Sequence, residues 1–545
     1  MTQFKGTFVS EGISIGTVRV LPEPIVVTES YTDDVQFEIN RYEKANEEAL
    51  RISDELIEKA TDDAAKEILE IHKMMLDDLD FKETVIGGIT DQKYTAQYAV
   101  KEAGRILSQM FFHMEDEYMR ARSADVLDIA SMLVKILSGH AQENYDEPSI
   151  FVGNDIMPSQ LVELDPKIIL GFAFTEGSVN SHSGIVARNM SIPMVCQINE
   201  PLKSFEGKLG IVDGKAGVFI VEPDEETLAK YQKKQKEYQD FQKMLAELKG
   251  KEDKTLDGHT LKIKANIGKP EDLPKVLDND AAGVGLFRSE FLFLDSTDYP
   301  TEEEQFDAYK TVAVGLEGKP LVIRTLDIGA DKTIPYFNLP EEKNPALGYR
   351  AVRICLDRVD LFKTQLRAIL RASHYGNISI MVPMIISLEE VLEVKRILNE
   401  VKEDLRKENI PFNEDVELGI MIETPASVII SDILAQEVDF FSVGTNDLTQ
   451  YTLAVDRENQ KVKFDKHHLA IIRMLKMIVD NAHKYGTRVC ICGELGADLD
   501  LTEYYVAIGL DEVSVSSPAV LKVRNNLRKI SYEEAVKKLN SYIKE

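Results

Sequence analysis

Hydrophobic and polar positions change their periodicity several times along the chain. Residues 6–21 read as two short apolar runs on either side of a glycine-bounded turn, which predicts strands. From about residue 35 to 139 apolar residues recur at helical spacing with charged residues between them, which predicts a helical bundle. Short strand-like runs return between about 148 and 222. The pattern therefore predicts a small α/β domain of residues 1–21 and 148–222, with a helical domain inserted at 22–147.

A heptad-like stripe of apolar residues follows between residues 223 and 252. From Leu228 to Leu248 its large apolar residues are spaced by three, seven, three, four and three positions, and Gly250 is a candidate helix C-cap. This pattern predicts one long helix that connects the two halves of the chain.

The region from 253 to 545 alternates strand-like apolar runs with helix-like segments. The runs are LKIKANIG, GVGLFRSE, PLVIRTLDIG, ISIMVPMI, ELGIMIETP, DFFSVGTND, RVCICGEL and EVSVSS. Most are continuously apolar, as parallel strands buried on both faces require. Eight such strands alternating with helices predict a (β/α)8 TIM barrel. The expected fold class is therefore a multidomain α/β protein with a C-terminal barrel.

Composition and charge narrow the classes of function. The chain has 545 residues and a net charge of −29, from 93 acidic and 64 basic residues. This balance argues against nucleic-acid binding and permits a basic protein partner. No apolar run is long enough to span a bilayer, and the segment MTQFKGTFVSEG has no apolar core typical of a signal peptide, so we expect a cytoplasmic protein without membrane insertion. Four cysteines are too few for a disulfide framework in a chain of this length.

Charged and polar residues follow the predicted barrel strands, where barrel active sites lie. They are Asn266, Arg288, Arg324, Lys332, Glu423, Asn446, Asp447, Arg457 and Cys492. Arginine side chains bind phosphate or carboxylate oxygens in a bidentate way. Glu423 and Asp447 supply hard oxygen ligands suited to Mg²⁺. Any one of these residues could be an ordinary loop charge, but together they favour a site for a small phosphorylated acid with Mg²⁺.

His182 stands where a polar loop becomes helix-like, in the segment GSVNSHSGIVAR. The amino end of a helix favours an incoming anion, and it also keeps an imidazole neutral and therefore nucleophilic. Our hypothesis is that His182 accepts a phosphoryl group, held by the backbone amides of Ser183 and Gly184. A structural role is the alternative, and we assign it to most of the other histidines.

Longer motifs carry a resemblance to a known family. Residues 439–457, DFFSVGTNDLTQYTLAVDR, resemble the barrel signature of Enzyme I of the bacterial phosphoenolpyruvate-dependent sugar phosphotransferase system. The segments AAGVGLFRSEFLFL, VIRTLDIGADK, NPALGYRAVRI and CGELGAD extend the match along the second half, and ILEIHKMMLDD and EYMRARSADVLDI carry it into the helical insert. The resemblance covers nearly the whole chain.

The resemblance implies an activity and a role for each candidate residue. The chain would be a phosphoenolpyruvate-protein phosphotransferase that is phosphorylated on His182, releases pyruvate and uses Mg²⁺, with Cys492 as the acid that protonates the enolate. Glu423 and Asp447 match the metal ligands. The matching substrate-binding residues are Arg288, Arg324, Lys332, Arg350, Asn446, Asp447 and Arg457.

The resemblance also implies partners. The α/β domain would swivel and deliver the phosphoryl group to a histidine of HPr, the small carrier protein that drives sugar uptake. The helical insert would be the docking surface for HPr, with the candidate contacts Glu67, His72, Met75 and Arg122. The barrel would form a homodimer.

The sequence departs from the family at two places and leaves two alternatives. Ser178, Asn180 and Gly184 replace the usual residues around the histidine, and the segment after Arg457 is shorter than expected. Asn180 can still cap the helix. A non-catalytic regulator that binds phosphoenolpyruvate or a carrier is supported only by this altered loop. A relative of pyruvate phosphate dikinase or phosphoenolpyruvate synthase would need a nucleotide-binding domain, for which no segment remains.

Overall fold

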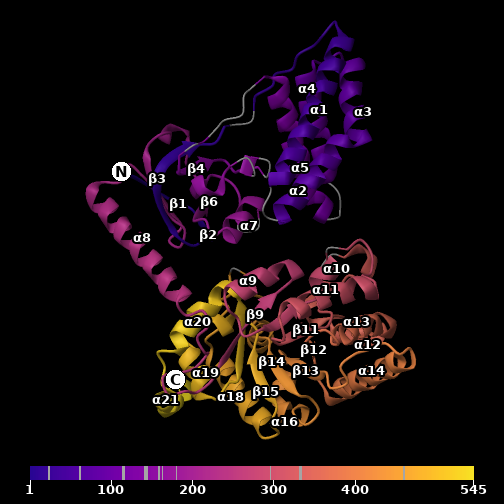
Figure 1. The fold of residues 1–545 in the computed structure, drawn as a ribbon, viewed down its shortest axis with the longest axis vertical. Coiled ribbons are helices and arrows are strands. Elements are labelled where there is room, and N and C mark those ends of the chain that lie inside the picture. The colour runs from indigo at the N-terminus through magenta and orange to yellow at the C-terminus, as the bar shows by residue number, and fades with distance from the viewer. Residues whose placement is uncertain are drawn as a thin grey trace. The chain divides into compact units, whose positions relative to one another are not determined.

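The computed structural model describes residues 1–22, 25–59, 63–112, 117–139, 145, 147–157, 160–161, 164–178, 181–294, 296–330, 334–457, 459 and 461–544. The chain forms two compact units, Met1–Gln242 and Lys243–Glu545. Helix α8, Glu225–Ala246, spans the boundary between them (Figure 1). The long connecting helix predicted from the heptad-like stripe is therefore present, although it ends four residues before Gly250, which has a positive φ of 74°.

An eight-stranded mixed sheet organises the α/β part of the first unit, in the order β1-β8-β7-β3-β4-β5-β6-β2 within the described residues. The strands are β1 Thr2–Lys5, β2 Thr7–Ser10, β3 Ile13–Val20, β4 Ser149–Gly153, β5 Ile169–Phe174, β6 Met194–Cys196, β7 Leu209–Asp213 and β8 Val218–Val221. Strands β3, β4, β5 and β6 are parallel neighbours. Because β3 and β4 pair directly, the long segment between them begins and ends at neighbouring strands of the sheet.

The segment between β3 and β4 forms a helical bundle (Figure 1). Its described helices are α1 Val35–Lys59, α2 Asp63–Asp77, α3 Leu79–Thr90, α4 Ala96–Phe112 and α5 Glu117–Leu137. Tyr42, Ala45 and Ala49 of α1 lie one helical turn apart and are buried together with Ile129 and Leu133 of α5. The 3.6-residue period seen in the sequence therefore becomes the bundle core.

The second unit is a closed barrel of parallel strands. Its strands are β9 Lys262–Ile267, β10 Val284–Arg288, β11 Leu321–Arg324, β12 Ile378–Val382, β13 Glu417–Ile422, β14 Phe440–Val443, β15 Arg488–Ile491 and β16 Glu512–Ser516. The predicted barrel is confirmed, and each of the eight strand-like runs contains one of these strands. Continuous apolar runs identified them because their outward side chains pack under helices while part of the inward set fills the barrel.

Helices surround the barrel strands (Figure 1). They are α9 Leu273–Asp278, α10 Glu290–Leu294, α11 Glu302–Gly315, α12 Val352–Asp357, α13 Val359–Ala372, α14 Leu388–Lys407, α15 Pro425–Ile429, α16 Ser431–Leu434, α17 Thr445–Leu453, α18 Leu469–His483, α19 Thr502–Ala507, α20 Val520–Leu527 and α21 Tyr532–Lys544. Capping boxes open two of the longer ones, Thr301 with Glu304 at α11 and Ser387 with Glu390 at α14. None of the described helices is both long and apolar enough to cross a membrane.

An apolar layer fills the middle of the barrel and divides its interior. The layer consists of Leu286, Val322, Met381, Met421, Phe440 and Cys492. Polar side chains lie at both ends of the strands on either side of it, Arg324 at the carboxyl ends and Lys264 at the amino ends. The barrel therefore has two separate polar regions, the mouth and the base.

Candidate active site

The barrel mouth gathers side chains from the carboxyl ends of several strands. Arg288 and Arg324 end β10 and β11 and are register partners. Glu423 follows β13, Asp447 lies in the first turn of α17, and Cys492 follows β15. Parallel strands in a closed barrel bring their carboxyl ends to one rim, so residues far apart in sequence meet there.

Two buried arginines share one carboxylate at this rim. Arg324 Nη1 lies 2.8 Å from Asp327 Oδ2, and Arg350 Nη2 donates to Asp327 Oδ1 over 3.1 Å. Arg324 Nη2 also donates to Glu290 Oε1 over 2.5 Å. Burial lowers the pKa of the Arg324 guanidinium, but the Asp327 and Glu290 carboxylates outweigh it, so that pKa lies above its ordinary value. The cations are thus fixed in place and remain charged, ready to bind an anion.

Asp327 and Glu290 are site residues that the sequence analysis missed. Both are buried, at 4% relative exposure each. Each lies two or three residues after a strand-end arginine, Glu290 after Arg288 and Asp327 after Arg324. That spacing was the available signal, since a buried guanidinium needs a carboxylate partner.

Glu423 is a fully buried carboxylate with an unsatisfied oxygen. Its Oε1 accepts a hydrogen bond from the Met384 amide over 2.7 Å, whereas its Oε2 has no partner among the described residues. Burial and the nearby Asp447 and Asp327 carboxylates raise the pKa of Glu423 well above its ordinary value, and Arg324 only partly opposes them. A buried, unsatisfied oxygen beside a second carboxylate fits a hard divalent cation. Such an ion would supply the missing interaction of the oxygen and reduce the repulsion between the two carboxylates.

The Cys492 thiol is buried beside these charges. Its Sγ donates to the Val443 carbonyl oxygen over 3.6 Å, and the side chain is 3% exposed. Burial raises the pKa of Cys492 to about 11, although Ser442, Arg324 and Arg288 oppose the rise. The thiol is therefore protonated at neutral pH and can act as an acid, and the neighbouring arginines would stabilise the thiolate that forms.

The remaining candidates at the mouth are more exposed or lie outside the described residues. Asn446 and Asp447 are half-buried, and Asn446 Oδ1 accepts from the Glu494 amide over 3.4 Å. The side chains of Arg288 and Arg457 are exposed. Lys332 belongs to the segment 331–333, which is outside the described residues. The structure thus assembles the buried candidates into one network, with exposed arginines at the same rim or just beyond α17.

His182 begins helix α7, His182–Asn189, in the first unit. The helix start is as expected, but the N-cap is Ser181, whose Oγ accepts from the Gly184 amide over 3.3 Å. The predicted cap, Asn180, lies outside the described residues, as does the side chain of His182. Because the Gly184 amide already donates to Ser181, it is not available to a phosphoryl group in this arrangement. The Ser181 hydroxyl also contacts Ser183, which is buried.

The proposed docking residues of the bundle are less exposed than the sequence suggested. His72 is 1% exposed, and its Nε2 lies 3.3 Å from Asp125, whose other oxygen accepts from Arg122 over 3.0 Å. Such burial does not fit a direct contact between His72 and a docked protein. Met75 is half-buried, whereas its neighbour Met74 is 69% exposed.

Leu76 and Glu67 belong to the same helix, α2, as Met74 and Met75. Leu76, next to Met75, is fully buried in the bundle core. The side chain of Glu67 lies outside the described residues. Met74 is therefore an exposed apolar residue of α2.

Comparison with protein families covers most of the chain. Residues 242–532 match the family described as PEP-utilising enzyme, PEP-binding domain. Residues 5–122 match its N-terminal domain, and residues 145–217 match its mobile domain. The barrel with its mouth lies within the first of these matches, and His182 lies within the last.

Relatives align over almost their full length. The chain is 42% identical over 539 residues to the phosphoenolpyruvate-protein phosphotransferase of Priestia megaterium, covering 97% of this chain and 94% of the relative. It is 40% identical to the enzymes of the same name from Geobacillus stearothermophilus and Bacillus subtilis strain 168, covering 98% of this chain in both and 94% and 96% of those relatives.

The unsatisfied Glu423 carboxylate generates a stability prediction. With metal removed by a chelator at pH 7, Glu423→Gln should raise the free energy of unfolding by about 1 kcal/mol, because it removes an ionisable group whose charged form is destabilised by burial and by Asp447 and Asp327. The pKa of Glu423 is raised in the folded state, so the wild type is less stable than Glu423→Gln at pH 7. This difference in the free energy of unfolding shrinks as the pH falls toward the ordinary pKa of glutamate. Differential scanning calorimetry at pH 7 and pH 5 measures both effects, with the exposed Glu271→Gln as control. A lower melting temperature for Glu423→Gln at pH 7 would refute the assignment.

Proposed function

The chain belongs to the phosphoenolpyruvate-protein phosphotransferase family and is a transferase, and from this premise we propose how its residues carry out the reaction. The barrel mouth binds phosphoenolpyruvate, and the phosphoryl group passes to His182 with release of pyruvate. The observation that carries this proposal is the pair of buried arginines fixed by Asp327 beside the unsatisfied Glu423 carboxylate and the protonated Cys492 thiol.

Arg324 and Arg350 bind the anionic oxygens of the substrate. Their carboxylate partners hold the guanidinium planes before substrate arrives, so little reorganisation is needed when charge develops on the transferring group. Arg288 and Arg457, whose side chains are exposed, add donors from the rim when substrate is bound. Lys332 and Asn446 belong to the same proposed substrate site.

Glu423 and Asp447 are the proposed ligands of Mg²⁺. Mg²⁺ prefers an octahedron of oxygens, and phosphate oxygens and water would complete the set that two carboxylates begin. When bound, the ion neutralises charge on the phosphoryl oxygens. The Met384 amide orients the Glu423 carboxylate by holding Oε1, which leaves Oε2 directed away from that bond.

The chemistry divides between His182 and Cys492. Nε2 of neutral His182 attacks phosphorus in line, a P–N bond forms, and the bond from phosphorus to the enol oxygen breaks. The resulting enolate takes the Cys492 Sγ proton at its methylene carbon and becomes pyruvate. Arg324 and Arg288 stabilise the thiolate until solvent returns a proton.

The phosphoryl group then moves to a histidine of an HPr-like carrier in the cytoplasm, in service of sugar uptake. We infer that the α/β domain swivels to carry His182 between the mouth and the carrier. The carrier docks on the bundle around Met74 and Met75, and His72 and Arg122 position α2 and α5 beneath it through Asp125. The barrels pair in a homodimer.

The named alternatives are less consistent with these observations. The matched relatives span nearly this whole chain and are phosphotransferases by name, which leaves the dikinase and synthase reading without support. A regulator without catalysis would not need the protonated thiol and unsatisfied carboxylate that the mouth contains.

The role of His182 predicts the fate of labelled phosphate. His182→Ala, incubated with Mg²⁺ and phosphoenolpyruvate labelled in its phosphoryl group, should incorporate no acid-labile, base-stable label, because no other nucleophile is proposed. His374→Ala changes an exposed barrel histidine and should label like wild type. Wild-type labelling of His182→Ala would exclude this role.

The Cys492 thiol predicts a split between binding and protonation. Cys492→Ala should bind phosphoenolpyruvate with an unchanged Kd but lower turnover by about 100-fold, the lower range for loss of a general acid. Proton incorporation at the pyruvate methyl group in deuterated water should lose its stereospecificity. Cys490→Ala, two residues earlier on β15, is the matched control and should retain both. Wild-type turnover and stereochemistry in Cys492→Ala would place the proton donor elsewhere.

The exposed Met74 side chain predicts a separable effect on the carrier. Met74→Asp should leave labelling of His182 unchanged and slow transfer to the carrier at least tenfold, because it places a charge in an apolar contact. Met477→Asp on barrel helix α18, at 41% exposure, is the control. Equal transfer rates for both variants in a stopped-flow assay would remove Met74 from the docking surface.

A further inference from the structure

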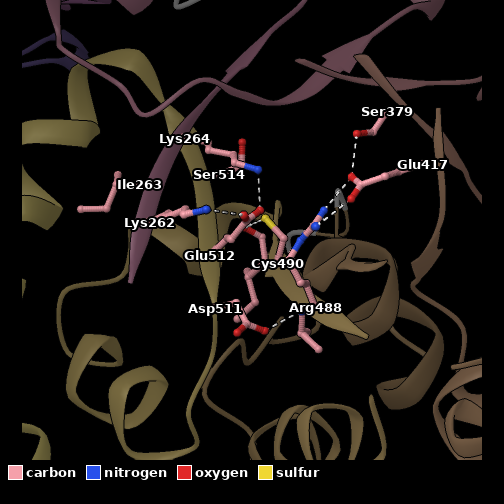
Figure 2. Close-up of polar contacts among 12 residues, drawn as sticks. Lys262, Ile263, Lys264, Ser379, Glu417, Arg488, Cys490, Asp511, Glu512 and Ser514 are labelled. Atoms are coloured by element: carbon pink, nitrogen blue, oxygen red, sulfur yellow. Dashed lines mark hydrogen bonds and ion pairs between the residues drawn. The ribbon is translucent and has the colours of Figure 1, made fainter. Parts of the chain in front are cut away.

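A polar cavity lies at the base of the barrel, at the opposite ends of the strands from the mouth. It has a volume of about 220 Å³. Lys262 begins β9, Glu417 begins β13, Arg488 begins β15 and Glu512 begins β16, and all four line it. Because the strands are parallel, their first residues meet at this end (Figure 2). The apolar layer that contains Phe440 separates this cavity from the mouth.

The cavity contains two ion pairs. Lys264 Nζ lies 2.5 Å from Glu512 Oε2, and these side chains are 4% and 8% exposed. Arg488 donates through both terminal nitrogens to Glu417 over 2.8 Å each (Figure 2). Arg488 holds the pKa of Glu417 below its ordinary value, so this carboxyl remains ionised. With Lys262, the lining carries three cations and two carboxylates, a net charge of +1.

Hydrogen-bond donors remain unused in this cavity. The Ser442 side chain is 1% exposed and lines the cavity; its Oγ has no nitrogen or oxygen partner among the described residues, and the Cys492 thiol, whose pKa it lowers, lies beside it. The Lys264 ammonium has three N–H donors, and Glu512 accepts one. The Lys262 ammonium lies 4.0 Å from Glu512, which is too far for a hydrogen bond, and the side chain is largely exposed. Because sulfur is only a weak hydrogen-bond partner, this buried hydroxyl can still form a stronger bond with a ligand or water.

The size and charge of the cavity define the ligand. A volume of about 220 Å³ holds roughly seven waters at about 30 Å³ each, or a small ion with part of its hydration shell. Lys262, Arg488 and Glu417 are partly exposed, so the cavity is accessible from the base. We propose that the base of the barrel binds a small oxyanion, a phosphate or a short carboxylate, held by Lys264, Lys262 and the Ser442 hydroxyl.

Ion pairs can also serve only to stabilise the base of the barrel. The experiment therefore separates a stabilising role from a binding role. Equilibrium dialysis of the full chain with labelled inorganic phosphate, and separately with labelled acetate, measures binding without turnover. The result therefore stands whether or not the chain transfers phosphoryl groups. Phosphate binding without acetate binding would identify a phosphate site, and the reverse a carboxylate site.

Variants assign the bound ion to one end of the barrel. Arg288→Ala with Arg457→Ala removes two exposed cations of the mouth and should leave the binding to the base unchanged. Lys264→Met with Glu512→Met replaces the buried pair by apolar side chains of similar size, an exchange that proteins often tolerate, and should weaken binding at least tenfold.

A milder variant keeps the test valid if the double variant does not fold. Ser442→Ala removes only the side-chain hydroxyl and should weaken binding about fivefold, as expected for one hydrogen bond. The exposed Ser541→Ala is its control. Wild-type affinity in Ser442→Ala and in any folded Lys264 and Glu512 variant, or loss of binding in the mouth variant alone, would overturn the proposal.

Discussion

The arrangement of the barrel mouth depends on one interaction, the ion pairs of two buried arginines with a shared carboxylate. Arg324 and Arg350 are both more than nine-tenths buried, and a guanidinium in that setting needs a carboxylate partner. Asp327 serves both, one oxygen for each arginine, and Glu290 serves Arg324 as well. Asp327 also lies near Glu423: burial and the Asp447 and Asp327 carboxylates raise the pKa of Glu423, and its Oε2 has no hydrogen-bond partner among the described residues. The site is therefore preorganised for an anion and a cation together, as phosphoryl transfer requires.

The apolar layer gives each barrel strand two distinct polar ends. On β15 and just after it, Arg488 lies at the base, Cys490 lines the base cavity and Cys492 faces the arginines of the mouth. The alternation of side chains along a strand places all three on the inward face. Burial raises the pKa of both thiols, but only Cys492 lies near the arginines that would stabilise its thiolate. The positions of the two cysteines along this strand thus explain why Cys492, and not Cys490, is the proposed acid.

Sequence patterns predicted the barrel, and the position of Arg288 and Arg324 at the ends of its strands, because each follows from a local rule. Apolar runs predict barrel strands, and charged residues after them predict a mouth. Asp327 and Glu290 were missed because no local pattern tells a buried ion-pair partner from a surface carboxylate. His72 was chosen by resemblance, yet its burial with Asp125 depends on how α2 packs against α5. The cap by Ser181 likewise depends on where the helix starts within one residue, which periodicity does not fix.

The central claim is that Asp327 positions the two arginines that bind phosphoenolpyruvate. Isothermal titration calorimetry of phosphoenolpyruvate with Mg²⁺ into Asp327→Asn tests it directly, with the exposed Asp480→Asn as control and thermal unfolding to verify the fold. Loss of the shared anion should weaken binding at least tenfold while the control binds like wild type, because freed guanidinium groups must be reordered by the substrate. Unchanged affinity in a folded Asp327→Asn would contradict the claim.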